Sequence, residues 1–127
     1  MGHRSRLYSA YVDVPRPRYD ATVSFYGELL GKPAVTDPDD PDYTSYGDAE
    51  TGIQLYVQSV GNDAPRVHLD FETDDVEAEV ARLTALGATE VERIKTWVVM
   101  QDPVGTVFCV IRVQDTAAFE AHATAWP

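Results

Sequence analysis

Apolar and polar residues alternate most clearly at the start of the stretch 66–91. This alternation predicts that the stretch begins as a β-strand. Side chains alternate between the two faces of a strand. One face is therefore apolar and the other polar (Val67, Leu69 and Phe71 against His68, Asp70 and Glu72). We expect the apolar face to pack in a core and the polar face to carry a functional site.

A helix is predicted directly after this strand. Asp74 suits its N-cap, and Glu77 completes a capping box. The apolar residues that follow recur at helical spacing (Val76, Val80, Leu83 and Leu86), and Gly87 is expected to end the helix. The helix should therefore cover the apolar face of the strand.

The first half of the chain shows the same order. Residues 8–14 alternate as a strand, and Asp20 is expected to cap a helix over 20–30 that ends at Gly31. Its predicted buried stripe and flanking residues are apolar or aromatic (Val23, Tyr26 and Leu30, with Phe25 and Leu29). The acidic, proline-containing segment 36–42 is interpreted as a surface loop.

Further strands are expected in both halves. Residues 43–46 and 53–57 form a predicted hairpin around residues 47–52, and residues 59–65 suit a linker. The second half continues with three strands, a turn and a C-terminal helix capped by Asp115 or Thr116 (strands near 90–94, 97–101 and 106–113, turn 102–105, tail 115–126).

The two halves are thus an internal repeat of strand, helix and three strands. We expect an α+β fold of two βαβββ modules, at about residues 7–58 and 66–113, that form a cupped mixed sheet around a cleft. Residues 7–113 would form this domain, and residues 114–127 a helical tail.

Composition narrows the classes of partner. The formal net charge of −11 argues against binding to nucleic acids and to anionic membrane surfaces, and favours a neutral or cationic small molecule over a polyanion. No apolar run approaches the length of a membrane span, and no secretory signal is visible. The single cysteine, Cys109, is consistent with a reducing cytoplasm.

Several short motifs resemble those of glyoxalase-like domains of the vicinal oxygen chelate superfamily, which includes glyoxalase I, dioxygenases and bleomycin-resistance proteins. The motifs span residues 8–113 in the family's order (Val12-Asp13-Val14-Pro15, Ser24-Phe25-Tyr26, Leu29-Leu30-Gly31, Val67-His68-Leu69-Asp70, Asp74-Asp75-Val76, Leu86-Gly87-Ala88, Trp97-Val98-Val99, Asp102-Pro103 and Phe108-Cys109-Val110). The resemblance implies the paired-module fold predicted above and a homodimer.

The resemblance also implies where a metal would bind. Metal-dependent members use four inward side chains, two from each module, and these positions fall at Ser9, Gln54, His68 and Cys109. Serine and glutamine are poor ligands, and Cys109 replaces the glutamate that is ligand and base in glyoxalase I. We therefore expect no cofactor, no tightly bound metal and no glyoxalase I activity, with a weakly bound divalent ion as the alternative.

The predicted cleft carries three kinds of candidate. His68 and Asp70 are candidate catalytic residues, although His68 also fits a histidine that is only hydrogen-bonded. Cys109 fits either a nucleophile or a small buried apolar residue. Seven residues are expected to contact a ligand (Ser9, Tyr11, Gln54, Tyr56, His68, Trp97 and Cys109). Three of them, Tyr11, Tyr56 and Trp97, would form an aromatic wall.

Three hypotheses of function remain open at this point. The first is a protein that binds a small organic molecule, as bleomycin-resistance-like members do. The second is a lyase, isomerase or dioxygenase-like enzyme that uses His68 with Asp70, or a weakly held divalent ion. The third is a regulatory module that binds a partner through its tail and acidic loop.

Overall fold

The structure, a computed structural model, describes residues 2–47, 52–61 and 65–127. These residues form two compact units. Unit 1 consists of Met1–Tyr8 and His68–Pro127, and unit 2 of Ser9–Val67. Strand β1 (His3–Val14) therefore contributes its first half to unit 1 and its second half to unit 2. The cleft that the repeat predicts between the modules stays a prediction.

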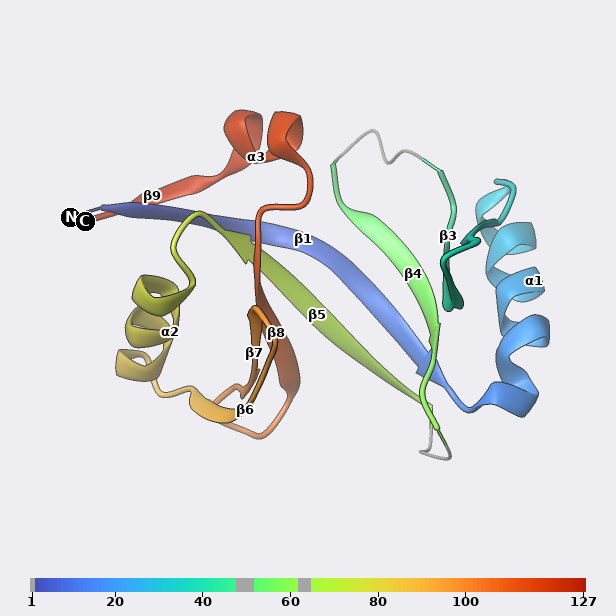
Figure 1. Cartoon of the computed structure of the whole chain (residues 1–127), viewed down its shortest axis with the longest axis horizontal. Helices are drawn as coiled ribbons and strands as arrows, with labels where there is room; N and C mark the ends of the chain where they lie inside the picture. Colours follow the sequence, from blue (N-terminus) through green and yellow to red (C-terminus); the bar gives the residue numbers. More distant parts are fainter. Residues whose placement is uncertain (1, 48–51, 62–64) are drawn as a thin grey trace. The chain divides into compact units, whose positions relative to one another are not determined.

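Unit 1 contains a mixed sheet in the order β9-β1-β5-β8-β7-β6. Its elements after β1 are strand β5, helix α2, strands β6, β7 and β8, helix α3 and strand β9 (Arg66–Thr73, Val76–Ala85, Thr89–Ile94, Trp97–Gln101, Val107–Arg112, Thr116–His122 and Thr124–Trp126). β5 and β8 run parallel, whereas β8 with β7 and β7 with β6 run antiparallel. β9 pairs with the start of β1, so the two chain ends lie side by side (Figure 1).

The core of unit 1 lies between α2 and one face of this sheet. Val80 of α2 joins a buried apolar cluster with residues of β7 and β8 (Val98, Met100, Phe108 and Val110). Leu69 and Phe71 pack against the cluster, as the alternation in β5 predicts. Leu83 also packs there, but Leu86 is 67% exposed and does not continue the predicted stripe.

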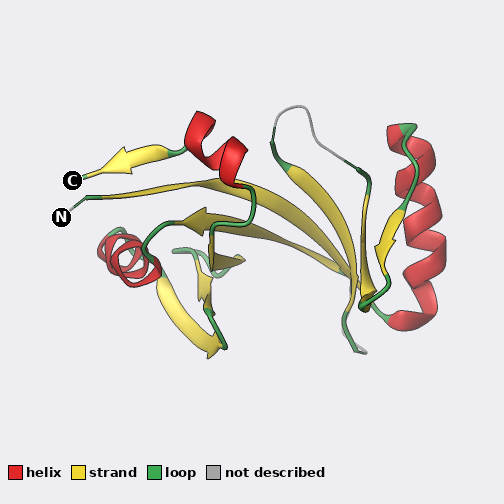
Figure 2. Ribbon diagram, turned by 45° about the horizontal axis from the view of Figure 1, so that its top comes forward, coloured by secondary structure: helices red, strands yellow, loops and turns green. Residues whose placement is uncertain are grey.

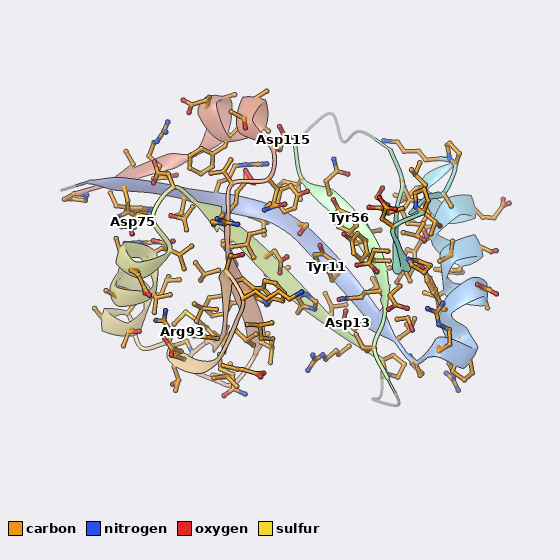
Figure 3. The ribbon with its side chains drawn as sticks, in the orientation of Figure 1. Tyr11, Asp13, Tyr56, Asp75, Arg93 and Asp115 are labelled. Carbon is orange, nitrogen blue, oxygen red and sulfur yellow. The ribbon has the colours of Figure 1, made fainter. Side chains whose placement is uncertain are left out.

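The predicted cap of α2 is wrong by one residue. The Asp75 carboxylate accepts a hydrogen bond from the backbone N–H of Ala78, at 3.0 Å, and Asp75 lies at the start of the helix in Figure 3. Asp74 instead accepts hydrogen bonds from the backbone N–H and the Nε of Arg4. The sequence pattern does not distinguish two adjacent aspartates, whereas Arg4 on β1 pairs with only one of them. Gly87 follows the helix with a positive φ of 106°, as expected of a helix-ending glycine.

Unit 2 packs helix α1 (Tyr19–Leu30) against a four-stranded arrangement in the order β2-β3-β4-β1 (Figure 2). The strands after β1 are β2 (Val35–Asp37), β3 (Asp40–Ser45) and β4 (Gln54–Ser59). β4 runs parallel to β1 and antiparallel to β3. The core consists of residues from β1, α1 and β4 together with Tyr46, which directly follows β3 (Val14, Tyr19, Tyr46 and Val57, with Val12, Val23 and Tyr26 packed against them).

Helix α1 differs from its prediction at both its cap and its buried face. The N-cap is Arg18, without a side-chain cap bond, because a short 3-10 turn (Arg16–Arg18) leads into the helix. Asp20 lies in the first turn instead. Tyr19 is the buried residue of the helix. Phe25 and Leu29, which were predicted to flank the buried stripe, are 58% and 61% exposed, and Leu30, the last residue of that stripe, is 39% exposed. Gly31 ends the helix with φ 66°, as predicted.

The acidic segment 36–42 is not the loop that the sequence suggests. β2 and β3 form a short antiparallel hairpin across it, and the Thr36 and Thr44 hydroxyls hydrogen-bond each other at 2.7 Å. The main hairpin of β3 and β4 is confirmed, although residues 48–51 of its predicted turn lie outside the described residues. Residues 62–64 of the predicted linker also lie outside them.

The remaining strands agree closely with expectation. β7 has the predicted bounds, and β6 and β8 differ from theirs by one residue at their ends. Asp115 caps α3 through the N–H of Ala118, but the tail then continues as β9, which the sequence did not predict. Among the described residues, no helix combines the length and apolar character needed to cross a membrane.

A buried polar network in unit 1 joins the first strand, α2 and the C-terminal strand. Glu79 on α2 is 1% exposed and accepts hydrogen bonds from Arg82 Nε at 2.7 Å and from His3 Nε2 at 2.8 Å. Burial alone raises the pKa of Glu79, but hydrogen bonds from Arg82, Ser5 and His3 outweigh it and lower this pKa to about 2. Arg82 stacks on Trp126, which donates to Ser5.

This network makes the stability of unit 1 sensitive to acid. The pKa of Glu79 is lower in the folded protein than the ordinary value of 4.5, so its stabilisation is complete above that pH and is lost as the pH falls toward 2. We expect the free energy of unfolding to fall by about 3 kcal/mol across this window. Urea titrations between pH 6 and pH 2 measure it, with Glu79→Gln as the reference. A variant with the same acid loss as wild type would contradict the assignment to Glu79.

Candidate functional site

Strands β5 and β8 of unit 1 bring three chemically reactive side chains together. Asp70 and Cys109 are direct partners in the parallel pairing of the two strands. His68 lies two residues before Asp70 on the same face. One ligand atom from each of the three residues lies within 4.8 Å of the other two. All three residues are buried, with exposures of 9%, 6% and 8% for His68, Asp70 and Cys109.

The local sequence explains why these side chains share one face. Leu69 and Phe71 must enter the core under α2, because they alternate with the polar positions and pack on its apolar cluster. A shift of the strand by one residue would move His68 and Asp70 into that core and expose Leu69 and Phe71. The apolar packing on one face of β5 therefore fixes the polar site on the other.

The Asp70 carboxylate is the least satisfied group in this cluster. Its Oδ1 is buried and has no hydrogen-bond partner among the described residues. The closest polar neighbour recorded for that atom is His68 Nε2, at 3.5 Å. A good hydrogen bond between such groups is about 2.7–2.9 Å long, so this contact is too long for one. The oxygen can thus accept a hydrogen bond from a further donor or contact a cation.

A second buried charge pair, which the sequence analysis missed, lies on the same face of β5. Glu72 is fully buried and accepts a hydrogen bond from Arg6 Nε at 3.1 Å. Its other oxygen accepts from the backbone N–H groups of Gln114 at 3.0 Å and Asp115 at 3.3 Å. Glu72 therefore holds the chain that leads into α3, and is a structural residue rather than a candidate for chemistry.

Arg6 was missed because the predicted first strand began at Tyr8, whereas β1 begins at His3. Its Nη2 is buried without a hydrogen-bond partner among the described residues. Extending the alternation upstream of Tyr8 would have placed Arg4 and Arg6 on one strand face. Two arginines at every second position, followed by a tyrosine, are a usable signal for a charged strand face.

In unit 2, the predicted ligand-binding residues occupy two neighbouring strands. Ser9 on β1 is fully buried and pairs in register with Gln54 on β4. Two positions further along the same pair of strands, Tyr11 and Tyr56 stack with their ring centroids 4.7 Å apart (Figure 3). Tyr43 of β3 meets Tyr56 edge to face at 5.9 Å. The structure thus brings together two members of the predicted aromatic wall and adds Tyr43.

Trp97, the third predicted member of the wall, belongs to unit 1. It begins β7 and lines a surface depression of about 350 Å³ beside the start of α2. Arg93 of β6 lines the same depression and forms ion pairs with Glu77 and Glu90. Within unit 1, Trp97 is therefore part of β7 and also lies beside charged side chains in this depression.

The arrangement of each unit defines the class of fold. Each joins a sheet of mixed direction to a helix on one face, in the element order strand, helix and strands. The predicted α+β class, of the glyoxalase/bleomycin-resistance type, is confirmed. The sequence model of the glyoxalase-like domain family matches residues 9–111 of this chain. The chain therefore belongs to this family, which is part of the vicinal oxygen chelate superfamily. No curated protein matches the chain.

Solved structures show the same fold at low sequence identity. Methylmalonyl-CoA epimerase from Mycobacterium tuberculosis is 17% identical, with a TM-score of 0.60 and coverage of 88% of this chain and 90% of its own. A benzaldehyde dehydrogenase from Legionella pneumophila, described as NAD-dependent, is 12% identical, with a TM-score of 0.60 and coverage of 84% and 98%. A mutant 4-hydroxymandelate synthase from Streptomyces coelicolor is 16% identical, with a TM-score of 0.54 and coverage of 88% and 50%.

The divalent ion that the superfamily implies does not fit the four family-equivalent positions of this chain. Ser9 offers a neutral hydroxyl and Gln54 a neutral amide, and both lie in unit 2. Only His68 and Cys109 are strong ligands, since structural and catalytic zinc sites use three or four His, Cys or carboxylate groups. The expectation that these four positions hold no tight ion stays a prediction, which rests on the chemistry of the side chains.

The buried Glu72 carboxylate makes a testable contribution to stability. Glu72→Ala leaves the Arg6 guanidinium buried without its partner, so we expect a loss of about 3–5 kcal/mol in the free energy of unfolding. Glu77→Ala is the control, because its ion pair with Arg93 is exposed and should contribute less than about 1 kcal/mol. Equal losses in urea denaturation of the two variants would contradict the role of Glu72.

Proposed function

We propose that this protein is a glyoxalase-like domain that binds a small organic molecule at the buried polar face of β5 and β8. The observation that carries the proposal is the Asp70 oxygen, which is buried without a hydrogen-bond donor among the described residues. Leaving such a group unsatisfied costs about 1–3 kcal/mol, so a ligand donor that reaches it would gain that free energy. Binding there needs no ion in the four family positions and no glyoxalase I base.

The chemistry of the cluster describes the ligand. Asp70 requires a donor such as a hydroxyl group, and the imidazole of His68 can donate to or accept from a second polar atom. The net charge of −11 disfavours polyanions. Hydroxylated compounds with at most one negative charge therefore fit best. Among the compounds named for structural relatives, 4-hydroxymandelate has these properties and methylmalonyl-CoA does not.

Calorimetric titration of the two compounds tests this selectivity. We expect 4-hydroxymandelate to bind at least about tenfold more tightly than methylmalonyl-CoA, a difference of about 1.4 kcal/mol. Asp70→Asn should weaken the binding of 4-hydroxymandelate about tenfold, because the amide is a poorer acceptor than the carboxylate. Asp20→Asn in the first turn of α1 is the matched control and should change nothing. Tighter binding of methylmalonyl-CoA would contradict the ligand class.

A second candidate function is an enzyme in which His68 and Asp70 act as an acid–base pair. The 3.5 Å separation of His68 Nε2 and Asp70 Oδ1 favours it, because a carboxylate beside an imidazole orients the ring and stabilises its protonated form. The pair could then exchange a proton with a carbon atom next to a carbonyl group. Cys109 would line the site without supplying a base.

Deuterium exchange distinguishes this enzyme from a protein that only binds. If the second candidate is correct, methylmalonyl-CoA in D2O should gain deuterium next to its thioester in the presence of the protein. His68→Ala should slow this exchange by at least about 100-fold, whereas His122→Ala, at an exposed position, should not change it. Mass spectrometry measures the label. No exchange above the protein-free rate would exclude this activity on the thioester.

A further inference from the structure

We propose that His68, Asp70 and Cys109 form a three-ligand site for an exchangeable soft divalent cation, with Zn²⁺ as the best fit. All three ligands come from β5 and β8 of unit 1. This set differs from the four family-equivalent positions, because it includes Asp70 and needs neither Ser9 nor Gln54. The inference goes beyond the proposed function, but it uses the same Asp70 oxygen, so the cation and a hydroxyl donor of an organic ligand are alternative occupants of that atom.

The separation of the His68 and Asp70 ligand atoms fits a shared cation. Ligands around tetrahedral Zn²⁺ lie about 2.0–2.1 Å from the ion for nitrogen and oxygen and about 2.3 Å for sulfur. Two such nitrogen and oxygen atoms are then about 3.3 Å apart, and nitrogen and sulfur about 3.6 Å apart. His68 Nε2 and Asp70 Oδ1 are 3.5 Å apart. Cys109 Sγ lies within 4.8 Å of one ligand atom of each of the other two residues.

Burial supplies an independent argument for a cation. The side chain of Asp70 is 9% exposed, and its Oδ1, which lies 3.5 Å from His68 Nε2, has no hydrogen-bond donor in the described part of the chain. A buried carboxylate without a compensating partner is costly, and proteins avoid it by pairing the charge or by coordinating a metal. A cation between Asp70, His68 and Cys109 provides the missing compensation.

The donor set also indicates which cation would bind. A thiolate and an imidazole favour Zn²⁺ over Mg²⁺ and Ca²⁺, which prefer oxygen ligands. Three protein ligands leave one tetrahedral position open, as in catalytic rather than structural zinc sites. We therefore expect the ion to exchange with chelators. The sequence led us to expect no tightly bound metal, with a weakly bound divalent ion as the alternative, and an exchangeable ion held by a set that includes Asp70 agrees with that alternative.

A cobalt titration tests the site without any assay of activity. Protein stripped with chelator should bind one equivalent of Co²⁺ and develop an absorption band from thiolate-to-cobalt charge transfer, and Zn²⁺ should displace the cobalt and remove the band. Cys109→Ser should abolish the band. Asp70→Asn should weaken Zn²⁺ binding by at least about 100-fold, because even the outer partners of metal ligands are worth about 10- to 100-fold in affinity.

The controls separate this site from the four-position arrangement of the family. Ser9→Ala and Gln54→Ala should leave Zn²⁺ affinity within about twofold of wild type, because neither residue is a ligand in the proposed set. If Gln54→Ala weakens binding and Asp70→Asn does not, the proposal is wrong. Absence of the charge-transfer band in wild-type protein would also overturn it. Circular dichroism melts verify that each variant is folded.

A measurement on the unmodified chain covers the case in which a variant does not fold. Zn²⁺ should slow the alkylation of Cys109 by iodoacetamide at least about tenfold, because a metal-bound thiolate is a poorer nucleophile. Mg²⁺ at the same concentration is the control and should have no effect. Equal rates with and without Zn²⁺ would refute the site. The metal experiments are run without 4-hydroxymandelate, and 4-hydroxymandelate is titrated into chelator-stripped protein, because both would occupy Asp70 Oδ1. A failure of the metal experiments then leaves the binding of 4-hydroxymandelate untouched, and the two proposals are tested separately.

Discussion

The burial of both faces of strand β5 is the constraint on which the structure of unit 1 depends. Leu69 and Phe71 pack under α2, so the alternate positions must place ionisable groups on the opposite face. That face also is almost completely buried. Each charge on it needs compensation, because an unpaired charge in a protein interior is strongly destabilising.

The carboxylates of β5 meet this requirement in different ways. Glu72 is paired with Arg6 and with two backbone N–H groups, and so ties β1 to the chain entering α3. Asp70 has only the distant contact with His68 among its described neighbours. The contrast separates an acid whose partners are supplied by the fold from one that lacks such partners on the same strand face. It is also the reason that the ligand and cation proposals both centre on Asp70.

Membership of the glyoxalase-like family describes the fold of this chain better than its chemistry. The structural relatives include an epimerase, a dehydrogenase and a synthase by name, at identities of 12–17%. A shared fold accommodates many activities, since function depends on the particular side chains of the site. In this chain Ser9, Gln54 and Cys109 depart from the side chains that metal-dependent members use at these positions.

Much of the local structure could be predicted from sequence alone. Period-two alternation identified strands in both halves, although not β2 or β9. Gly31 and Gly87 marked the ends of both main helices, because a left-handed backbone favours glycine. The errors arose where neighbouring residues offered equivalent local chemistry. Asp74 and Asp75 are both good caps, and only Arg4 of a distant strand decides between them. The acidic segment 36–42 lacks a periodic pattern, and its pairing with a neighbouring strand supplies the order.

The sequence by itself determined the α+β class, the two-faced character of β5 and the reactive identity of His68, because these follow from local periodicity and residue type. Only the tertiary structure decided which partners these side chains meet. The parallel pairing of β5 with β8 sets Asp70 beside Cys109, although the two residues lie far apart in the sequence. The long first strand brings Arg6 to Glu72. Such contacts depend on strand register across the sheet, and no local pattern of residues encodes that register.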